Sequence, residues 1–236
     1  MARMTTEAPP GNRPPSRPRR VVARVWAYVL DAPGTFVYLL ILGANTFALV
    51  HMSPRVRKYF LRTNSTNLAE LGHHPVKVLI TSAFWTQTPS FLIWFVLFNL
   101  FHVPAERWLG TLRWLVVIVI AHVGATFVSE GTVDLLIRAG ALPHRDTRTI
   151  DIGVSYALSG SVGVLTWLFA RPVRWYYLGV TGAFFLALLI GYRDFTNLGH
   201  FTAFLLGLAC YPLTRSRSTR GVLPPRFGVR QDGPHG

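Results

Sequence analysis

Six long apolar runs divide the chain, and each is bounded by charged residues or by proline. A helix needs about 20 apolar residues to cross the hydrocarbon core of a bilayer, with a usual range of roughly 17 to 25. The runs have about this length, so the pattern predicts an all-α polytopic membrane protein, a bundle of six transmembrane helices. The expected spans are residues 34–52, 89–108, 111–130, 151–170, 173–191 and 195–212.

The spans are expected to belong to one membrane domain, residues 25–213. Residues 1–24 are rich in proline and arginine without an apolar period, which predicts a disordered basic tail, and residues 214–236 are expected to form a second one. The first apolar run has no small-residue cleavage site, so it is expected to stay as a membrane anchor. The longest connection, residues 54–88, contains an apolar patch at 76–85 that predicts an interfacial or partly embedded helix.

Composition supports a membrane protein. Of 236 residues, 50% are hydrophobic and only 14% are charged, and the mean hydropathy is +0.34, which excludes an ordinary water-soluble enzyme. The net charge is +14, and 15 of the 24 lysine and arginine residues fall on the side of the two tails. The positive-inside rule therefore predicts a multi-pass membrane protein with both termini in the cytoplasm.

The basic charge predicts membrane lipids as a partner. Nucleic acid is not expected, because neither tail interleaves aromatic residues with a folded basic surface. The single cysteine, Cys210, lies in an apolar run and excludes an intrachain disulfide. No Cys/His spacing suggests a metal site.

Two polar side chains lie near the expected outer ends of the fourth and sixth runs. Ser155 follows Asp151 by four residues, and His200 follows Asp194 by six. At 1.5 Å per residue, each lies on the order of 6 to 9 Å below its flanking carboxylate, so their depths match. Small residues on both helix faces permit close approach, namely Ser159 and Gly163 beside Ser155, and Ala203 and Gly207 beside His200.

A serine that faces a neutral histidine is the minimum for nucleophilic acyl transfer, because the imidazole takes the hydroxyl proton as the oxygen attacks a carbonyl. No aspartate is spaced to complete a triad, so the expected centre is a dyad of Ser155 and His200. Hydroxyl, imidazole and water suffice, and no cofactor is expected. The alternative is that both side chains are packing groups hydrogen-bonded across a helix pair, although an intramembrane histidine favours a functional role.

These residues resemble the rhomboid family of intramembrane serine proteases, whose serine lies in a Gly-x-Ser-Gly motif on the fourth helix and whose histidine lies on the sixth. The resemblance spans roughly residues 81–212, and the chain looks closest to divergent actinobacterial rhomboid-like proteins. It implies that Ser155 and His200 cleave a transmembrane helix of a protein substrate near the outer membrane face. The stretches that carry the resemblance are Gly153-Val154-Ser155-Tyr156, Gly199-His200-Phe201-Thr202-Ala203 and Glu106-Arg107-Trp108-Leu109-Gly110-Thr111-Leu112-Arg113.

The sequence departs from the family pattern around the oxyanion site. Tyr156 replaces the glycine after the serine, and the family's His-x-x-x-Asn has Phe95 at the histidine position before Asn99. Loss of one oxyanion donor typically costs about 100- to 1,000-fold in kcat. Gln87 is a possible substitute donor beside the Ser155 backbone N–H. These departures leave open a second function, that of a catalytically inactive pseudoprotease that binds the transmembrane segments of a client.

Overall fold

The structure, a computed structural model, describes residues 17–87, 90–192 and 194–215. Contacts divide the chain into two units, residues 1–31 and 32–236. In the first unit, helix α1 (Arg17–Leu30) includes residues 17–24, which the sequence assigned to a disordered tail. Arginines and apolar residues alternate there with a helical period, which the proline-rich residues before them obscured. The rest of both predicted tails, residues 1–16 and 216–236, lies outside the described residues.

The described part of the second unit is built from helices, which confirms the predicted all-α class. Three of these helices are long and apolar enough to span a bilayer, namely α2 (Pro33–His51), α8 (Thr111–Arg138) and α10 (Val173–Tyr192). Two further apolar helices are shorter, namely α9 (Val154–Leu165), which continues as the 3-10 turn η3 (Thr166–Leu168), and α11 (Phe195–Ala209), which is followed by the 3-10 turn η4 (Tyr211–Thr214).

The second predicted span is a helical run made of three pieces. Helix α6 (Phe91–Leu97) passes into the π-helical turn η1 (Phe98–His102) and then into α7 (Val103–Leu109). Phe98 and Val103, at the two junctions, keep right-handed helical dihedral angles. A π turn is a local widening of an α-helix and is frequent at functional sites. Here it ends at His102, which is fully buried.

The connection between the first two spans is largely helical, and α5 covers most of its apolar patch. It consists of α3 (Pro54–Thr63), α4 (Leu68–His73) and α5 (Pro75–Ala83). Helix α8 continues eight residues past its expected end, because Glu130 is buried and Asp134 pairs with Arg138 at 2.8 Å one turn later. The turn η2 (His144–Arg148) follows, and α9 then begins three residues later than expected.

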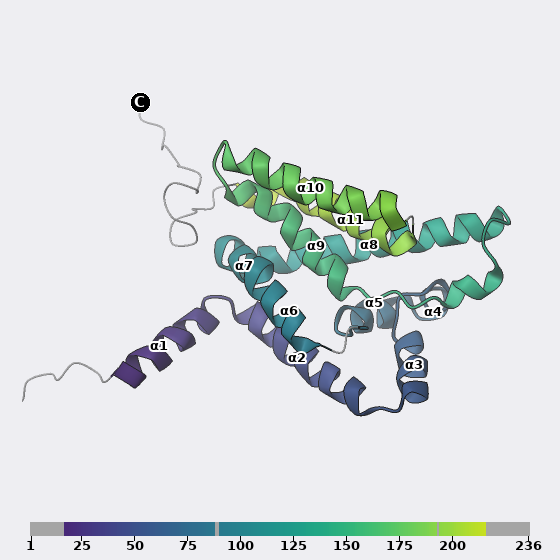
Figure 1. The fold of residues 1–236 in the computed structure, drawn as a ribbon, viewed down its shortest axis with the longest axis horizontal. Coiled ribbons are helices and arrows are strands. Elements are labelled where there is room, and N and C mark those ends of the chain that lie inside the picture. The colour runs from purple at the N-terminus through teal and green to yellow at the C-terminus, as the bar shows by residue number, and fades with distance from the viewer. Residues whose placement is uncertain (1–16, 88–89, 193, 216–236) are drawn as a thin grey trace, which may run out of the picture. The chain divides into compact units, whose positions relative to one another are not determined.

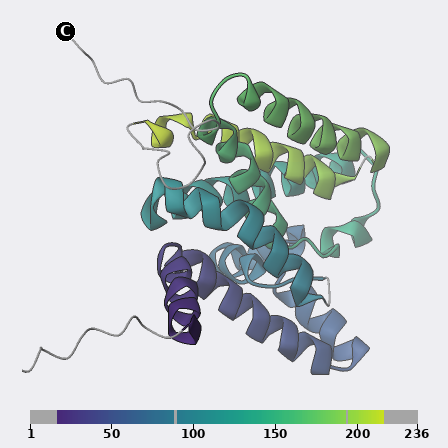
Figure 2. The same ribbon diagram turned by 60° about the vertical axis from the view of Figure 1, so that its left-hand side comes forward.

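Helices α8, α9 and α11 pack against one another, and the two views of the ribbon show them side by side (Figures 1 and 2). Glycines bring these helices together: a Cβ at Gly207 would strike the carbonyl oxygen of Gly160, and one at Gly163 would strike that of Phe204. On the other side of α9, a Cβ at Gly160 would strike Ala121 of α8. Small residues of this kind let membrane helices approach closely. The predicted small-residue faces therefore meet at the crossing of α9 and α11.

Glu106 fixes the start of α2 to the turn between α7 and α8. Its carboxylate accepts the backbone N–H of Gly34 at 2.8 Å, the N–H of Thr35 at 2.6 Å and the hydroxyl of Thr111 at 2.7 Å. The first N–H groups of a helix have no partner within the helix, and an anion there also complements the helix dipole. Glu106 is thus a structural residue that satisfies the buried end of α2.

Candidate active site

The connection that leads into α9 is anchored on both sides. The Asp151 carbonyl accepts the backbone N–H of Thr66 at 3.0 Å and its hydroxyl at 3.3 Å. Two residues later, the N–H of Gly153 donates to the carbonyl of Ser82 at 3.2 Å. These bonds tie the start of α9 to the helices between the first two spans.

Gly153, the N-cap residue of α9, packs directly on a histidine of α8. A Cβ at this position would overlap the ring of His122. That ring is held in turn, because its Nε2 lies 2.8 Å from the Leu79 carbonyl and 3.4 Å from the Ser82 hydroxyl. A glycine is therefore required here by packing. Asp151 lies two residues before Gly153 and is not the N-cap residue.

Ser155 is the second residue of α9, so its backbone N–H belongs to the first turn and has no partner within the helix. Its side chain is half-buried, and its hydroxyl donates to the carbonyl of Ile152 at 3.3 Å. One turn further along, the Ser159 hydroxyl donates to the Ser155 carbonyl at 2.9 Å.

His200 lies in the second turn of α11. Asp194 caps this helix: it accepts the backbone N–H of Asn197 at 2.7 Å and the side-chain amide of Asn197 at 3.0 Å. The Nδ1 of His200 lies 3.5 Å from the Oδ1 of Asn197. Its other nitrogen, Nε2, is buried without a hydrogen-bond partner.

Ser155 and His200 line the same cavity. It measures about 500 Å³ and lies among α6, η1, α9, α10 and α11. No hydrogen bond joins the two side chains in the described structure, in which Ser155 is bonded to Ile152. The remaining wall is mostly apolar and includes Trp94, Leu97, Phe101, Leu158, Phe184 and Leu188.

Tyr156 does not line this cavity. Its side chain is fully buried and packs with Ala121 and Ala125 of α8 and with Ala203 of α11. A Cβ at Gly199 would strike the Tyr156 ring and hydroxyl, so the glycine before the histidine makes room for this tyrosine. The sequence suggested that Tyr156 crowds the space after the serine, but its ring points away from the cavity.

Comparison with known proteins identifies the family of this chain. A family model described as rhomboid-like protein matches residues 27–220. The chain belongs to the rhomboid-like family. No curated protein and no solved structure matches it. Together with the long apolar helices, membership of the rhomboid-like family makes the chain a membrane protein that lies in lipid.

The two amides considered as oxyanion donors in a rhomboid-like centre bond elsewhere. Gln87 donates to the Ile150 carbonyl at 3.3 Å, and Asn99 donates to the Phe95 carbonyl at 2.7 Å. Neither lines the cavity of Ser155 and His200. The donor that stays close to the serine is therefore its own backbone N–H.

A second pair of serine and histidine was missed from the sequence. The Nδ1 of His102 accepts the indole N–H of Trp114 at 3.0 Å and also lies 3.0 Å from the Ser161 hydroxyl. Both members of this pair are fully buried. The signal was present, because an intramembrane histidine is a candidate by default. Its partner, however, could not be foreseen without the π turn of η1.

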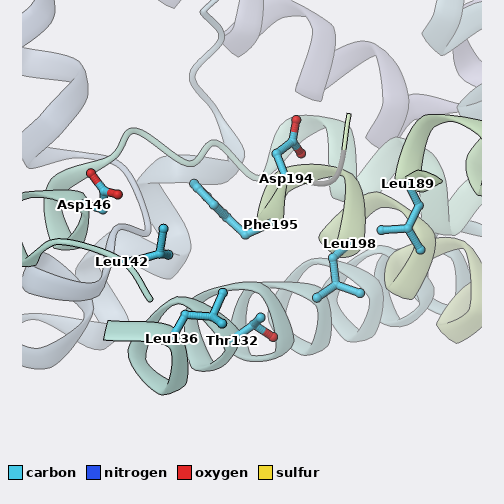
Figure 3. A pocket seen from close by; sticks show the side chains of 8 residues that line it. All are labelled: Thr132, Leu136, Leu142, Asp146, Leu189, Asp194, Phe195 and Leu198. Atoms are coloured by element: carbon cyan, nitrogen blue, oxygen red, sulfur yellow. The ribbon is translucent and has the colours of Figure 1, made fainter. Parts of the chain in front are cut away.

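Another cavity lies apart from both pairs. It measures about 450 Å³ and is bordered by the far end of α8, the connection after it and the α10–α11 junction. Figure 3 shows Thr132 and Leu136 along one side and Phe195 and Leu198 along the other. Its carboxylates come from Asp146 and from Asp194, the latter already engaged as the α11 cap. No histidine or serine lines it.

Proposed function

We propose that this rhomboid-like protein is an intramembrane serine protease in which Ser155 is the nucleophile and His200 the general base. In the proposed topology, six spans cross a bacterial plasma membrane, both termini are cytoplasmic, and α9 and α11 begin near the outer face. The observation that carries the proposal is the shared cavity, which both Ser155 and His200 line.

The histidine is poised for the role of a base. A neutral imidazole has one donor and one acceptor nitrogen. If Nδ1–H donates to Asn197, the unpartnered Nε2 is the acceptor. In the proposed mechanism, the Ser155 hydroxyl leaves the Ile152 carbonyl and donates its proton to Nε2 once substrate is bound, since hydrogen bonds in free enzymes often tighten only in the complex. The serine oxygen then attacks the substrate carbonyl, and the imidazolium protonates the leaving amine.

The oxyanion is stabilised from the backbone. The N–H of Ser155 lies in the first turn of α9, where N–H groups are free and the helix dipole is positive. Preorganised donors of this kind are usually the largest electrostatic contribution to acyl transfer. With no side-chain donor from Gln87 or Asn99, we expect a slower centre than a complete oxyanion hole would give.

The cavity favours a transmembrane helix as substrate. Its walls include residues of α6, η1 and α10, and nine of the 13 lining side chains are apolar. An extended or unwound stretch near the outer end of an apolar helix fits such a site, because its flanking residues stay in lipid or against apolar walls.

A second candidate function is that of a pseudoprotease that binds transmembrane clients without cleaving them. The observation in its favour is the Ser155 hydroxyl, which bonds to the Ile152 carbonyl and makes no bond to His200. In this alternative the same apolar cavity holds a client helix, and the serine and histidine are packing groups.

Labelling of the purified protein with a fluorophosphonate probe separates these functions, because the probe reacts only with an activated serine. We expect the native chain to label, Ser155→Ala to abolish labelling, and His200→Ala to slow it by at least about 1,000-fold. Ser159→Ala is the matched control, since Ser159 lines the same cavity one turn away, and it should label normally. A folded native protein that never labels would overturn the protease and favour the pseudoprotease.

A further inference from the structure

A buried carboxylate lies behind the candidate base. Asp151, in the connection before α9, is 1% exposed. Its two oxygens accept the Tyr156 hydroxyl at 2.8 and 3.0 Å, and one of them also accepts the Ser129 hydroxyl at 3.4 Å. Its backbone carbonyl is held by Thr66. Both ends of this aspartate are therefore fixed by hydrogen bonds.

Tyr156 contacts both this carboxylate and the histidine. Its ring lies against the His200 ring in an edge-to-face arrangement, with centroids 5.2 Å apart and planes at 71°. Tyr156 is fully buried and lies outside the cavity, whereas His200 lines it. The contact therefore restricts the imidazole from outside the cavity. Within the described residues, the only hydrogen-bond contact of the His200 ring is the long one from Nδ1 to Asn197.

We propose that Asp151 and Tyr156 are positioning residues for His200, and this inference rests on the proposed protease function. Asp151 fixes the Tyr156 hydroxyl, and the Tyr156 ring then keeps the imidazole of His200 in one orientation at the cavity wall. The aspartate acts through the tyrosine and never touches the histidine. An acid thus supports the base even though no aspartate is spaced to bond the imidazole directly.

The chain offers a matched control for loss of the hydroxyl. Tyr38 is also buried, donates to the Ala83 carbonyl at 2.6 Å and makes edge-to-face contacts with Phe84 and Phe98. Tyr38→Phe therefore removes the same chemical group from a similar setting that does not adjoin His200. A loss of activity that follows only from general destabilisation should appear in both tyrosine variants.

The experiment measures the fluorophosphonate labelling rate together with the thermal midpoint for each variant. We expect Tyr156→Phe and Asp151→Ala to slow labelling by about 10-fold, a moderate loss for residues that orient a base. Asp151→Asn, which still accepts the tyrosine hydroxyl, should recover most of the native rate. Tyr38→Phe should label at the native rate.

The ¹⁵N spectrum of the His200 side chain, assigned with His200→Gln, provides a readout that a merely structural role would not move. We expect a single tautomer in the native chain and in Tyr38→Phe, and a mixture in Tyr156→Phe and Asp151→Ala. Native labelling that neither of the last two variants slows would overturn this inference alone, as would equal slowing by Tyr38→Phe. A native chain that never labels would overturn the proposed function and this inference with it.

Discussion

Helix α9 carries two serines that each lie in the same site as a histidine, and the two pairs of residues differ in burial, in hydrogen bonding and in access to a cavity. Ser161 and His102 are fully buried, lie 3.0 Å apart and adjoin the indole of Trp114. Ser155 and His200 are half-buried, share no hydrogen bond and line a cavity of about 500 Å³. The pair that has the geometry of a dyad is closed to substrate, and the pair without it is open.

The difference shows why a short distance between serine and histidine does not identify an active site. The Nδ1 of His102 already accepts the Trp114 N–H, so this nitrogen is occupied by a donor that cannot leave without cost. Buried polar groups of this kind are retained because breaking one bond leaves its partner unsatisfied. We therefore interpret His102 as a clamp between η1, α8 and α9, and His200 as the candidate base.

The largest effect that would test this distinction is on stability. His102→Ala removes two hydrogen bonds and leaves a cavity against Phe98 and Trp114, so it should lower the free energy of unfolding by about 2 to 4 kcal/mol. His200→Ala should cost clearly less, since its ring is partly exposed and its only hydrogen-bond contact is long. Denaturant titration in mild detergent measures both.

Labelling of the same variants tests which of the two histidines activates a serine. At a temperature where it stays folded, His102→Ala should still react with the fluorophosphonate, as should Ser161→Ala, whereas His200→Ala should not. If His102→Ala lost labelling while remaining folded, the buried pair would be the functional one and the assignment of roles would be reversed.

Ser155 and His200 could be proposed as a pair from the sequence because the signals for them are local. Periodic small residues put Ser155 and Ser159 on one face, and the step from Asp194 to His200 places the histidine in the second turn of α11. The apolar runs likewise predicted most helices. The motif stretches around Ser155, His200 and Glu106 predicted the rhomboid-like family, which the match over residues 27–220 confirms. Features that depend only on the helical period or on the length of an apolar run could be predicted directly from the sequence.

What the sequence could not give depends on side-chain direction between helices. Tyr156 looked like an obstruction next to the serine, but it is directed into a space made by Gly199 and Ala203 of α11. His102 gave no sign of its partner, because a π turn shifts its register relative to an ordinary helix. The side-chain directions of Tyr156 and His102 both depend on how three helical segments pack together.

The site of Ser155 and His200 also has a carboxylate nearby. Asp151, in the connection before α9, bonds to Tyr156, and the Tyr156 ring packs on His200. Burial raises the pKa of Asp151 to about 6, although the hydroxyls of Tyr156 and Ser129 stabilise its charged form. The charge of Asp194, at the start of α11, also opposes the ionisation of Asp151. Asp151 thus ionises at a higher pH when the protein is folded than when it is unfolded.

The sign of the resulting pH dependence follows from that shift. The stability that Asp151 contributes is fully present below its unfolded pKa, near 4, and is lost as the pH rises through about 6. Two pKa units correspond to a loss of up to about 3 kcal/mol. Unfolding of the native chain and of Asp151→Asn between pH 4 and 7 measures it. A difference between the two that stays constant with pH would mean that Asp151 does not titrate in this range.

The smallest effect concerns the space that lets Tyr156 lie against His200. Gly199→Ala places a methyl group on the Tyr156 ring and hydroxyl, so it should cost about 1 to 3 kcal/mol of stability through overpacking. The same change on a Tyr156→Leu background should cost much less, because the clashing atoms are gone. This difference is a coupling between two residues in contact and is measured by a double-mutant cycle.

Gly179→Ala supplies the matched control, because this glycine lies within α10 and a Cβ there meets nothing within 4 Å. Alanine is a better helix former than glycine, so this change should be neutral or slightly stabilising. Equal costs for Gly199→Ala with and without Tyr156 would show that the glycine serves the α9–α11 crossing itself. Gly199 would then act as Gly163 and Gly207 do, by letting the backbones of α9 and α11 approach closely. Tyr156 would have no part in shaping the site of Ser155 and His200.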